Sequence, residues 1–530
     1  MTSSPFPSHR PVLTAEAMRE ADRFSIEEYG IPGFTLMETA ARAATDQIEQ
    51  VFGLTAGKTV VCFGGKGNNG GDGFVVARVL HARGAHVRVL AMEGPDAMST
   101  DAAHNWRLLE DLARQDDDRL ALTRFEDLDQ LAAYAGADLY VDALLGTGLA
   151  SALREPLHSL VAWLNEQPAP TVALDVPTGL HSDRGVVLGA AVRADLTVTM
   201  GALKVGLLIN DGPARAGRVE VVEIGIPRFV IDRVQARPGC AGLPTDASVK
   251  AWLPERPRDA HKYSAGMALV VGGAAGMTGA PVMASMAAAR VGAGYVTCAC
   301  PRSIQPILAA KMTVVTTLAL PETPGGDLDP DGALDTLKPR LEKARALLVG
   351  SGQGRQAVTQ RFIRTLLQQT DLPAVVDADG LNALADDPDW IARHAAGRWI
   401  LTPHAGEFRR LAGANVDLTD RVGVAQEYAR RWNCVLILKG MPSVVGTPEG
   451  AAFINATGNP ALATAGTGDV LAGLCAGLLA QGLPPARAAV AALHLGGAAA
   501  DRYAAHRHPQ TMIATDLLDQ LPLVLQERFS

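Results

Sequence analysis

The chain has 530 residues, more than one hydrophobic core usually serves, so two or more domains are expected. Its hydrophobic fraction of 48% suits globular domains, and its scarcity of aromatic residues suits α/β folds, in which small residues let helices pack closely on sheets. The net charge of −8 lacks the basic footprint of a nucleic-acid-binding protein, so no nucleic-acid partner is expected.

Nothing in the sequence directs the chain to a membrane or an oxidising compartment. The segment Met1–Pro11 lacks an apolar signal core, and no apolar run reaches the roughly 18 residues of a membrane span. The six cysteines form no C-x-x-C pair and most lie in apolar runs, which is typical of reduced, buried thiols. We therefore expect a cytoplasmic protein.

The first half of the chain alternates helical and strand patterns. Residues 13–51 have apolar side chains at helical spacing, and residues 74–82 predict a further helix. Short apolar strands are expected at residues 58–63, 86–91, 138–143 and 171–175, most of them ending in polar or glycine-rich residues. This alternation predicts a parallel, doubly wound sheet, with ligands bound beyond the carboxyl ends of the strands.

A proline-rich stretch of little periodicity, residues 226–262, indicates a domain boundary. The strand–helix pattern then restarts, with strands at 267–271, 346–349, 374–377, 399–401 and 435–438, a helix at 280–291 and a helical region at 469–506. We predict a Rossmann-like parallel-sheet domain at residues 1–228, a linker at 229–245, and a second α/β domain at 246–530.

Candidate ligand-binding residues of the first domain follow its strands. Gly64–Gly73 contains two asparagines and an aspartate, which argue against a plain glycine-rich turn, and its N–H groups could bind an anion at a helix N-terminus. It matches neither the G-x-G-x-x-G motif nor a P-loop. Asp142 and Asp175 end two strands and Thr178 follows, so their oxygens could bind a hard cation, although helix capping is the alternative.

The strongest motif of the second domain is Thr464–Gly473, in which a Gly-Thr-Gly loop precedes Asp469 at an expected helix start. Such N–H donors suit a phosphoryl group, and an aspartate there can accept a hydroxyl proton during phosphoryl transfer; helix capping by Asp469 is the alternative. Further polar loops follow four strands, at residues 350–354, 377–382, 402–407 and 439–440. Their succession favours a ligand-binding His404 over a structural one.

Three segments of the first domain resemble the YjeF N-terminal family of NAD(P)HX epimerases: residues 65–73 (GKGNNGGDG), 141–149 (VDALLGTGL) and 174–180 (LDVPTGL). The resemblance covers roughly residues 11–226 and implies a Rossmann-like fold with a bound potassium ion. By motif position, the ion ligands would be Asn69, Asp142 and Thr178. The substrate site would comprise Asn68, Asn69, Gly70, Gly71, Asp72, Gly146, Thr147, Gly148, Leu149, Ala150, Ser151, Ala152 and Asp175. We take Asp175 as the catalytic polar group. The chain departs from the family at Glu38–Ala41, where Glu-Asn-Ala-Gly is usual, and it lacks the common Arg-Pro pair after Gly148.

The second domain resembles the ribokinase-like ADP/ATP-dependent NAD(P)HX dehydratases, the YjeF C-terminal family. The matching segments are residues 272–280, 377–382 (DADGLN), 402–404 (TPH), 438–440 (LKG) and 465–469 (AGTGD), within roughly 245–525. By position, the nucleotide would contact Lys439, Gly440, Met441, Pro442, Ser443 and Gly468. The hydrated dinucleotide would contact Ala280, Gly352, His404 and Asp469. Ala405 stands where family members often have proline.

The resemblances imply a bifunctional enzyme that repairs hydrated nicotinamide nucleotides. The first domain would interconvert the epimers of NADHX and NADPHX. The second would use ADP with Mg²⁺ to phosphorylate the ring hydroxyl, with Asp469 as base, and then release phosphate. Fusion of both domains implies ADP, and the families suggest a homo-oligomer. The alternatives are a small-alcohol kinase fused to a regulatory domain, which would leave a phosphorylated product, and a non-enzymatic nucleotide-binding scaffold, against which Asp469 argues.

Overall fold

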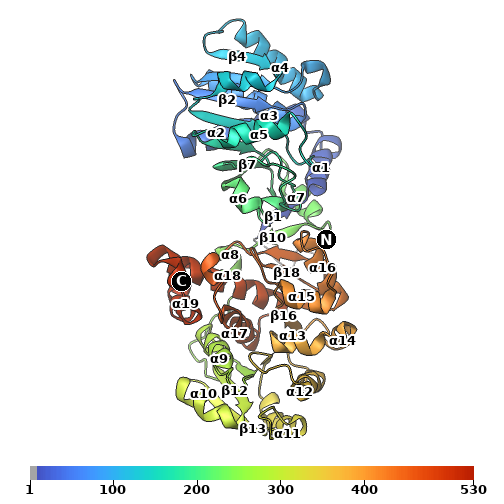
Figure 1. The fold of residues 1–530 in the computed structure, drawn as a ribbon, viewed down its shortest axis with the longest axis vertical. Coiled ribbons are helices and arrows are strands. Elements are labelled where there is room, and N and C mark those ends of the chain that lie inside the picture. Colours follow the sequence, from blue (N-terminus) through green and yellow to red (C-terminus); the bar gives the residue numbers. More distant parts are fainter. Residues whose placement is uncertain (1–8, 530) are drawn as a thin grey trace. The chain divides into compact units, whose positions relative to one another are not determined.

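The computed structural model describes residues 9–529, which divide into two compact units (Figure 1). Residues Arg10–Ala241 form the first, and residues 242–529 together with His9 form the second. The prediction that residues 1–11 contain no signal segment falls mostly outside the described residues. The α/β class with parallel sheets in both units confirms the expected fold class.

The first unit contains a parallel sheet in the order β4-β3-β2-β5-β6-β7-β9. Its strands are β2 (Thr59–Gly64), β3 (His86–Ala91), β4 (Leu120–Arg124), β5 (Leu139–Ala143), β6 (Thr171–Leu174), β7 (Leu196–Met200) and β9 (Arg218–Val222). The chain runs outward from β2 to β4, then crosses back to β5 on the other side of β2. The strand order therefore reverses between β2 and β5, which is where doubly wound sheets bind ligands.

Helices cover both faces of this sheet and bury its alternating side chains. Val60 and Cys62 face one apolar layer, and Val61 and Phe63 face the other. The helices are α1 (Ala15–Arg23), continued as a π-helix (Phe24–Glu28), α2 (Gly33–Phe52), α3 (Asn68–Ala82), α4 (Thr100–Ala113), α5 (Leu157–Asn165), α6 (Gly212–Ala216) and α7 (Arg228–Gln235). A separate parallel pair joins β1 (Arg10–Leu13) to β8 (Leu203–Lys204).

The stretch expected as a linker, residues 229–245, is largely ordered structure. Helix α7 buries Val230, Ile231 and Val234 in the core of the first unit, because its apolar residues recur at helical spacing. Strand β10 (Ala241–Leu243) follows and pairs with the second unit's sheet through Gly242. The first unit therefore extends to Ala241, beyond the expected end at residue 228.

The second unit's sheet has the order β13-β12-β11-β14-β15-β16-β17-β18-β19, parallel up to β17 and antiparallel after it. The strands are β11 (Met267–Val271), β12 (Tyr295–Pro301), β13 (Thr316–Leu320), β14 (Ala346–Val349), β15 (Ala374–Val376), β16 (Trp399–Leu401), β17 (Val435–Leu438), β18 (Val444–Gly446) and β19 (Ala452–Ile454). The order reverses between β11 and β14, so a second ligand site is expected there.

Two groups of helices cover the faces of this sheet. One comprises α9 (Gly279–Arg290), α17 (Thr467–Ala480), α18 (Pro485–His506) and α19 (Ala514–Phe529), over a core that includes Ala268 and Val270. The other includes α11 (Pro330–Leu341), α12 (Ala357–Gln368), α13 (Asp379–Leu384), α15 (Ala405–Ala412) and α16 (Arg421–Arg431), over Leu269 and Val271. Shorter helices are α8 (Asp246–Lys250), α10 (Gln305–Lys311) and α14 (Pro388–His394).

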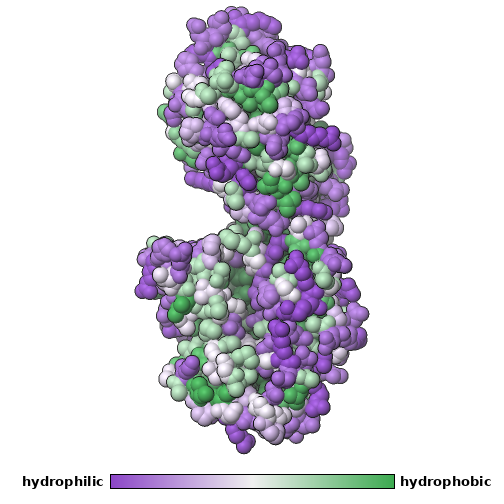
Figure 2. Space-filling view, in the orientation of Figure 1, coloured by the Kyte–Doolittle hydropathy of each residue, from purple (hydrophilic) through white to green (hydrophobic). Residues whose placement is uncertain are grey.

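The helices agree with the expectation that no segment is apolar enough to span a membrane. Hydrophilic side chains are spread widely over the face drawn in Figure 2. Among residues 9–529, no helix combines the length and apolarity that crossing a bilayer requires. All six cysteines are buried, as their apolar sequence neighbours predict.

Candidate active sites

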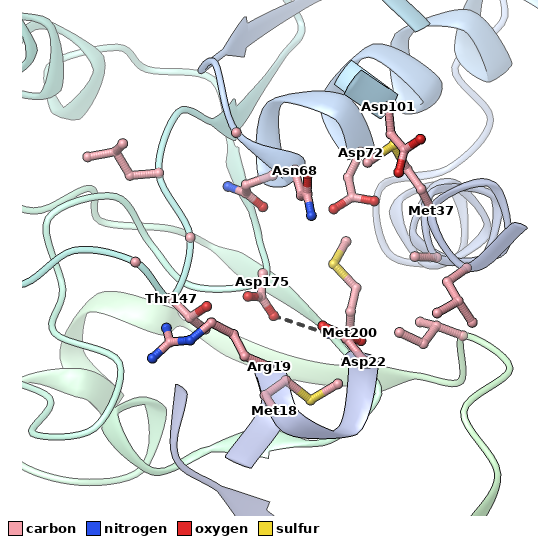
Figure 3. Close-up of a pocket in the computed structure, with 18 of the residues that line it drawn as sticks. Met18, Arg19, Asp22, Met37, Asn68, Asp72, Asp101, Thr147, Asp175 and Met200 are labelled. Carbon is pink, nitrogen blue, oxygen red and sulfur yellow. Dashed lines mark hydrogen bonds between the residues drawn. The ribbon is translucent and has the colours of Figure 1, made fainter. Parts of the chain in front are cut away.

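A cavity of about 530 Å³ opens at the switch point of the first sheet. The start of α3, the loop after β5 and the end of β6 line it on the sheet side, and α1 and α2 line it from the chain's N-terminal segment (Figure 3). Segments that follow three strands of the sheet, β2, β5 and β6, thus lie around one pocket. The lining includes Asn68, Asn69, Asp72, Gly146, Thr147, Gly148, Leu149 and Asp175 from the predicted site.

The glycines of the Gly64–Gly73 motif allow its backbone to pack directly against the backbone of the loop after β5 and of the start of α3. A Cβ at Gly65 would lie 1.8 Å from the Leu144 carbonyl oxygen, and one at Gly70 would lie 1.9 Å from the carbonyl oxygen of Gly65. Helix α3 begins at Asn68, inside the motif that was expected to be a loop. The motif therefore brings a helix N-terminus directly against the β5 loop, with N–H groups directed at the pocket.

Some predicted contacts lie away from the cavity. Gly70 and Gly71 are buried in α3 and pack on backbone and on Met37, and neither lines the pocket. Ala150, Ser151 and Ala152 are exposed and also lie outside the lining. The methyl group of Ala152 instead faces Gly189.

The three expected ion ligands offer buried oxygens. Asp142 is fully buried; Thr178 donates to it from its hydroxyl (2.7 Å) and from its backbone N–H (2.8 Å). Burial raises the pKa of Asp142 to about 6. The side-chain oxygen and nitrogen of Asn69 are buried without a hydrogen-bond partner among the described residues. An unsatisfied buried amide is costly, so an oxygen-binding cation fits this site.

Asp175 has an unusual backbone conformation, and its side chain pairs with Lys204, which sequence reasoning missed. Its backbone has φ +66°, which is rare for a residue with a Cβ. Its Oδ1 lies 2.5 Å from Nζ of Lys204, which is almost fully buried and also donates to the Met200 carbonyl oxygen at 2.6 Å. Lys204 lies in an apolar run, and a charge in such a run was the available signal.

Two more carboxyl groups face the same pocket. Burial, followed by the negative charges of Asp175 and Asp22, holds the pKa of Asp72 well above its ordinary value. Burial raises the pKa of Asp22 to about 6; Lys204 opposes this shift and Asp175 adds to it. Asp22 lies on α1 and was not among the predicted site residues. Acidic groups with such displaced pKa values mark candidate proton-transfer sites.

The second site lies at the switch point of the other sheet. Ala280 lies in the first turn of α9, and Gly352 follows β14 with φ +65°. A Cβ at Gly352 would lie 3.2 Å from the Ala280 Cβ and 2.9 Å from the carbonyl oxygen of Met277, so these two predicted substrate contacts are neighbours. The close approach of the Met277 backbone and the positive φ explain why position 352 is a glycine.

Helix α17 presents its N-terminus to this edge. Gly466 precedes the helix in a left-handed conformation (φ 93°), and Asp469 lies in the first turn. Burial, and then the charge of Asp377, raises the pKa of Asp469 to about 6, while Lys439 opposes the shift. A base with a pKa near neutrality, at a helix N-terminus that favours anions, suits phosphoryl transfer.

Lys439 links the motifs at three strand ends. Its Nζ lies 3.0 Å from Asp377 Oδ1 and 4.0 Å from Glu407 Oε2, and a Cβ at Gly468 would be 3.5 Å from it. Thr402 also donates to Asp377 Oδ1, at 2.6 Å. These carboxylates outweigh burial and keep the pKa of Lys439 above its usual value. A fixed ammonium group thus lies beside the α17 N-terminus, where phosphate charge would be stabilised.

The remaining predicted contacts surround this cluster. His404 caps α15: its Nδ1 accepts hydrogen bonds from the N–H groups of Gly406 and Glu407, and its ring is half exposed. The backbone of His404 bridges to Lys439. In the turn between β17 and β18, the side chain of Ser443 forms hydrogen bonds with the backbone of Gly440. This turn also contains Met441 and Pro442, and Met441 is exposed.

Two doubly wound sheets, each with polar loops gathered at its switch point, define a two-domain α/β enzyme. Its second domain has a lysine, an aspartate and a helix N-terminus arranged for phosphoryl transfer.

The comparisons agree with this class in both domains. A model described as YjeF-related protein N-terminus matches residues 33–206, and one described as NAD(P)H-hydrate dehydratase matches residues 268–523. Proteins named bifunctional NAD(P)H-hydrate repair enzyme Nnr are similar over both chains' lengths. The Salinibacter ruber protein is 56% identical (98% of this chain, 97% of the relative), and that of Moorella thermoacetica is 42% identical (97% and 96%).

The Escherichia coli protein of the same name is 34% identical, over 99% of this chain and 96% of the relative. A solved ADP/ATP-dependent NAD(P)H-hydrate dehydratase from Bacillus subtilis is 30% identical, covers 54% of this chain and 98% of its own, and has a TM-score of 0.45. The chain belongs to the family of bifunctional NAD(P)H-hydrate repair enzymes.

Proposed function

We propose that the chain repairs hydrated NADH and NADPH with two activities. The first domain interconverts the R and S epimers of NAD(P)HX. The second converts the S epimer to NAD(P)H at the expense of ADP, giving AMP and phosphate. The observation that carries the second activity is the meeting of Asp469, Lys439 and the α17 N-terminus at one sheet edge. The full-length relatives favour this function over a small-alcohol kinase.

The second domain's residues account for the dehydration chemistry. The ring hydroxyl of the hydrate is a poor leaving group, and phosphorylation makes it a good one. Asp469 accepts the hydroxyl proton, the N–H groups at the start of α17 stabilise the transferred phosphoryl group, and Lys439 stabilises its charge. Mg²⁺, bound with the nucleotide, would supply positive charge on the phosphates, and carboxylates such as Asp379 at this edge offer the oxygen atoms it prefers.

In the first domain, the proposed ion is potassium. Asn69, Asp142 and Thr178 offer oxygen atoms alone, which select hard cations, and their single carboxylate suits a monovalent ion better than Ca²⁺. The buried Asn69 amide, which has no hydrogen-bond partner within residues 9–529, supports this assignment. The ion would sit beside the α3 N-terminus and help to offset the charge of the dinucleotide. Asp175, paired with Lys204, is the proposed catalytic contact from β6.

The test of both activities uses purified epimers of hydrated NADH and the full chain. With ADP, the S epimer should regain the absorbance of reduced nicotinamide and release one phosphate for each NADH formed. Without nucleotide, either pure epimer should convert to a mixture. A stable phosphorylated product would instead indicate a kinase. Replacing ADP by ATP tests the nucleotide preference, and light scattering tests the expected homo-oligomer.

A further inference from the structure

The charged groups of the first domain's pocket do not balance. Its lining carries the carboxyl groups of Asp22, Asp72, Asp101 and Asp175. Its cationic side chains are Arg19, Lys66 and Lys204. Lys204 is already bound to Asp175, with Nζ 2.5 Å from Oδ1. Neither Asp22 nor Asp72 has a hydrogen-bond or ion-pair partner within residues 9–529, although both face the cavity. Two carboxyl groups are therefore unengaged at the site of the reaction.

These two groups come from different walls. Asp72 projects from the second turn of α3, and Asp22 projects from α1 next to Asp175 (Figure 3). The space between them is bordered by the methionines Met18, Met37 and Met200, which offer an apolar surface for a ring. The carboxyl group of Asp22 is close enough to Asp72 that its negative charge raises the pKa of Asp72. A flat ring bound between the walls would have one carboxyl group on each face.

We propose that Asp22 is a further catalytic residue of this pocket: together with the adjacent Asp175–Lys204 ion pair it acts on one face of the hydrated ring, and Asp72 acts on the opposite face. This inference rests on the proposed epimerase function and assigns its acid and base. Lys204 would hold Asp175 in place by their ion pair, which leaves Asp22 as the proton-carrying group of that wall.

The chemistry balances with these groups alone. Water adds to an enamine at the carbon next to nitrogen, so the hydroxyl lies on that carbon. Asp22, protonated, gives its proton to the hydroxyl; the C–O bond breaks, water leaves, and the nitrogen lone pair forms a C=N⁺ bond. A water molecule on the other face then adds to the carbon, the C=N π electrons return to nitrogen, and Asp72 takes the surplus proton. For the other epimer the two groups exchange roles, and solvent returns the proton between turnovers.

The two displaced pKa values agree with this division. One proton shared between two carboxyl groups is the working state, because one group must give and the other accept. Asp22 titrates near pH 6 and Asp72 well above its ordinary value, and Lys204, Asp175, Arg19 and Asp101 also face this space. Below about pH 6 both groups carry protons, so epimerisation should slow for either epimer as the pH falls.

The experiment uses the full chain without nucleotide, and each pure epimer of hydrated NADH. Asp22→Asn and Asp72→Asn should each lower kcat in both directions by about 10²–10⁴, the usual range for general acid–base groups, with a smaller change in KM. Asp111→Asn, an exposed aspartate on α4, is the matched control and should keep the wild-type rate. In ¹⁸O-labelled water, each inversion should place label in the hydroxyl.

The outcomes separate this inference from the proposed function. If the wild-type chain does not epimerise at all, the proposed function fails. If it does, and Asp22→Asn stays within threefold of wild type or inversion retains the original oxygen, the assignment is overturned. Circular dichroism checks that the variant folds, and dehydration of the S epimer checks that the other domain is unaffected. If Asp22→Asn does not fold, Asp22→Glu is measured in its place. Partial epimerase activity with a shifted acidic limb of the pH profile supports the catalytic role of Asp22. An unchanged pH profile overturns that role.

Discussion

Replacing Asp469 by asparagine should separate catalysis from stability in the second domain. Asparagine keeps the size of the side chain but cannot accept a proton. Loss of a general base lowers a rate by about 10²–10⁴, equivalent to about 3–5 kcal/mol on the activation barrier. Because the substitution leaves the Lys439–Asp377 ion pair in place, the nucleotide should still bind. We therefore expect the loss in kcat rather than in the KM for ADP.

The same substitution should stabilise the domain at alkaline pH. The pKa of Asp469 is raised from 3.8 to about 6, so ionising it costs free energy in the folded state that it does not cost in the unfolded chain. Because the pKa of Asp469 is higher in the folded state, the group contributes stability at pH values below its pKa in the unfolded chain. This contribution is lost as the pH rises through about 6. Relative to wild type, Asp469→Asn should gain about 1–3 kcal/mol at pH 8 and little at pH 4.

Two measurements decide this prediction. Phosphate release from the S epimer with ADP gives the rate, which in the wild type should also fall below about pH 6 as Asp469 becomes protonated. Denaturant unfolding at pH 4 and pH 8 gives the stability. Asp335→Asn, an exposed position on α11, serves as the control and should change neither. Turnover within tenfold of wild type, or a variant less stable at pH 8, would refute the reasoning.

Three other perturbations test the remaining parts of the structure. Asp142→Ala should slow epimerisation by on the order of 10–100-fold, the range seen when a metal site loses a supporting group. Dehydration of the S epimer should be unchanged. Equal epimerisation rates for variant and wild type, both in potassium and in a large organic cation, would refute the proposed ion site. Asp377→Asn removes the nearer of the two ion-pair partners that Lys439 has among the described residues and leaves Glu407 at 4.0 Å; it should cost about 3 kcal/mol, lowering Tm by about 6–12 °C. In a Lys439→Met background the same change should cost clearly less; an equal cost would contradict the ion pair. Cutting the chain between Ala241 and Gly242 should give two soluble parts with one activity each. A cut after residue 228 removes α7 from the first part, so the core surface that α7 covers should become exposed and the first part should be insoluble.

The sequence alone predicted the α/β class, the central strands and the chemistry-bearing loops. Buried parallel strands are continuous apolar runs, so Met267–Val271, Ala346–Val349 and Val435–Leu438 are strands with the predicted bounds. The Gly-Thr-Gly-Asp motif likewise gives a helix with Asp469 in its first turn, because the cause is local. Strands at the edges of the two sheets, such as β4 and β13, carry weaker patterns and were not predicted.

Only the tertiary structure decided which side chains meet in each pocket. Lys204 and Asp22 are nearly the length of the first domain apart in sequence, yet both lie at the pocket that holds Asp175. No local pattern marks Asp22 as more than an exposed helical residue; its displaced pKa follows from burial and from charges on other elements. Conversely, Ala150–Ala152 match a substrate segment by position but lie outside the cavity. Local sequence dictates backbone conformation, whereas desolvation and charge pairing depend on distances that exist only once the chain has folded.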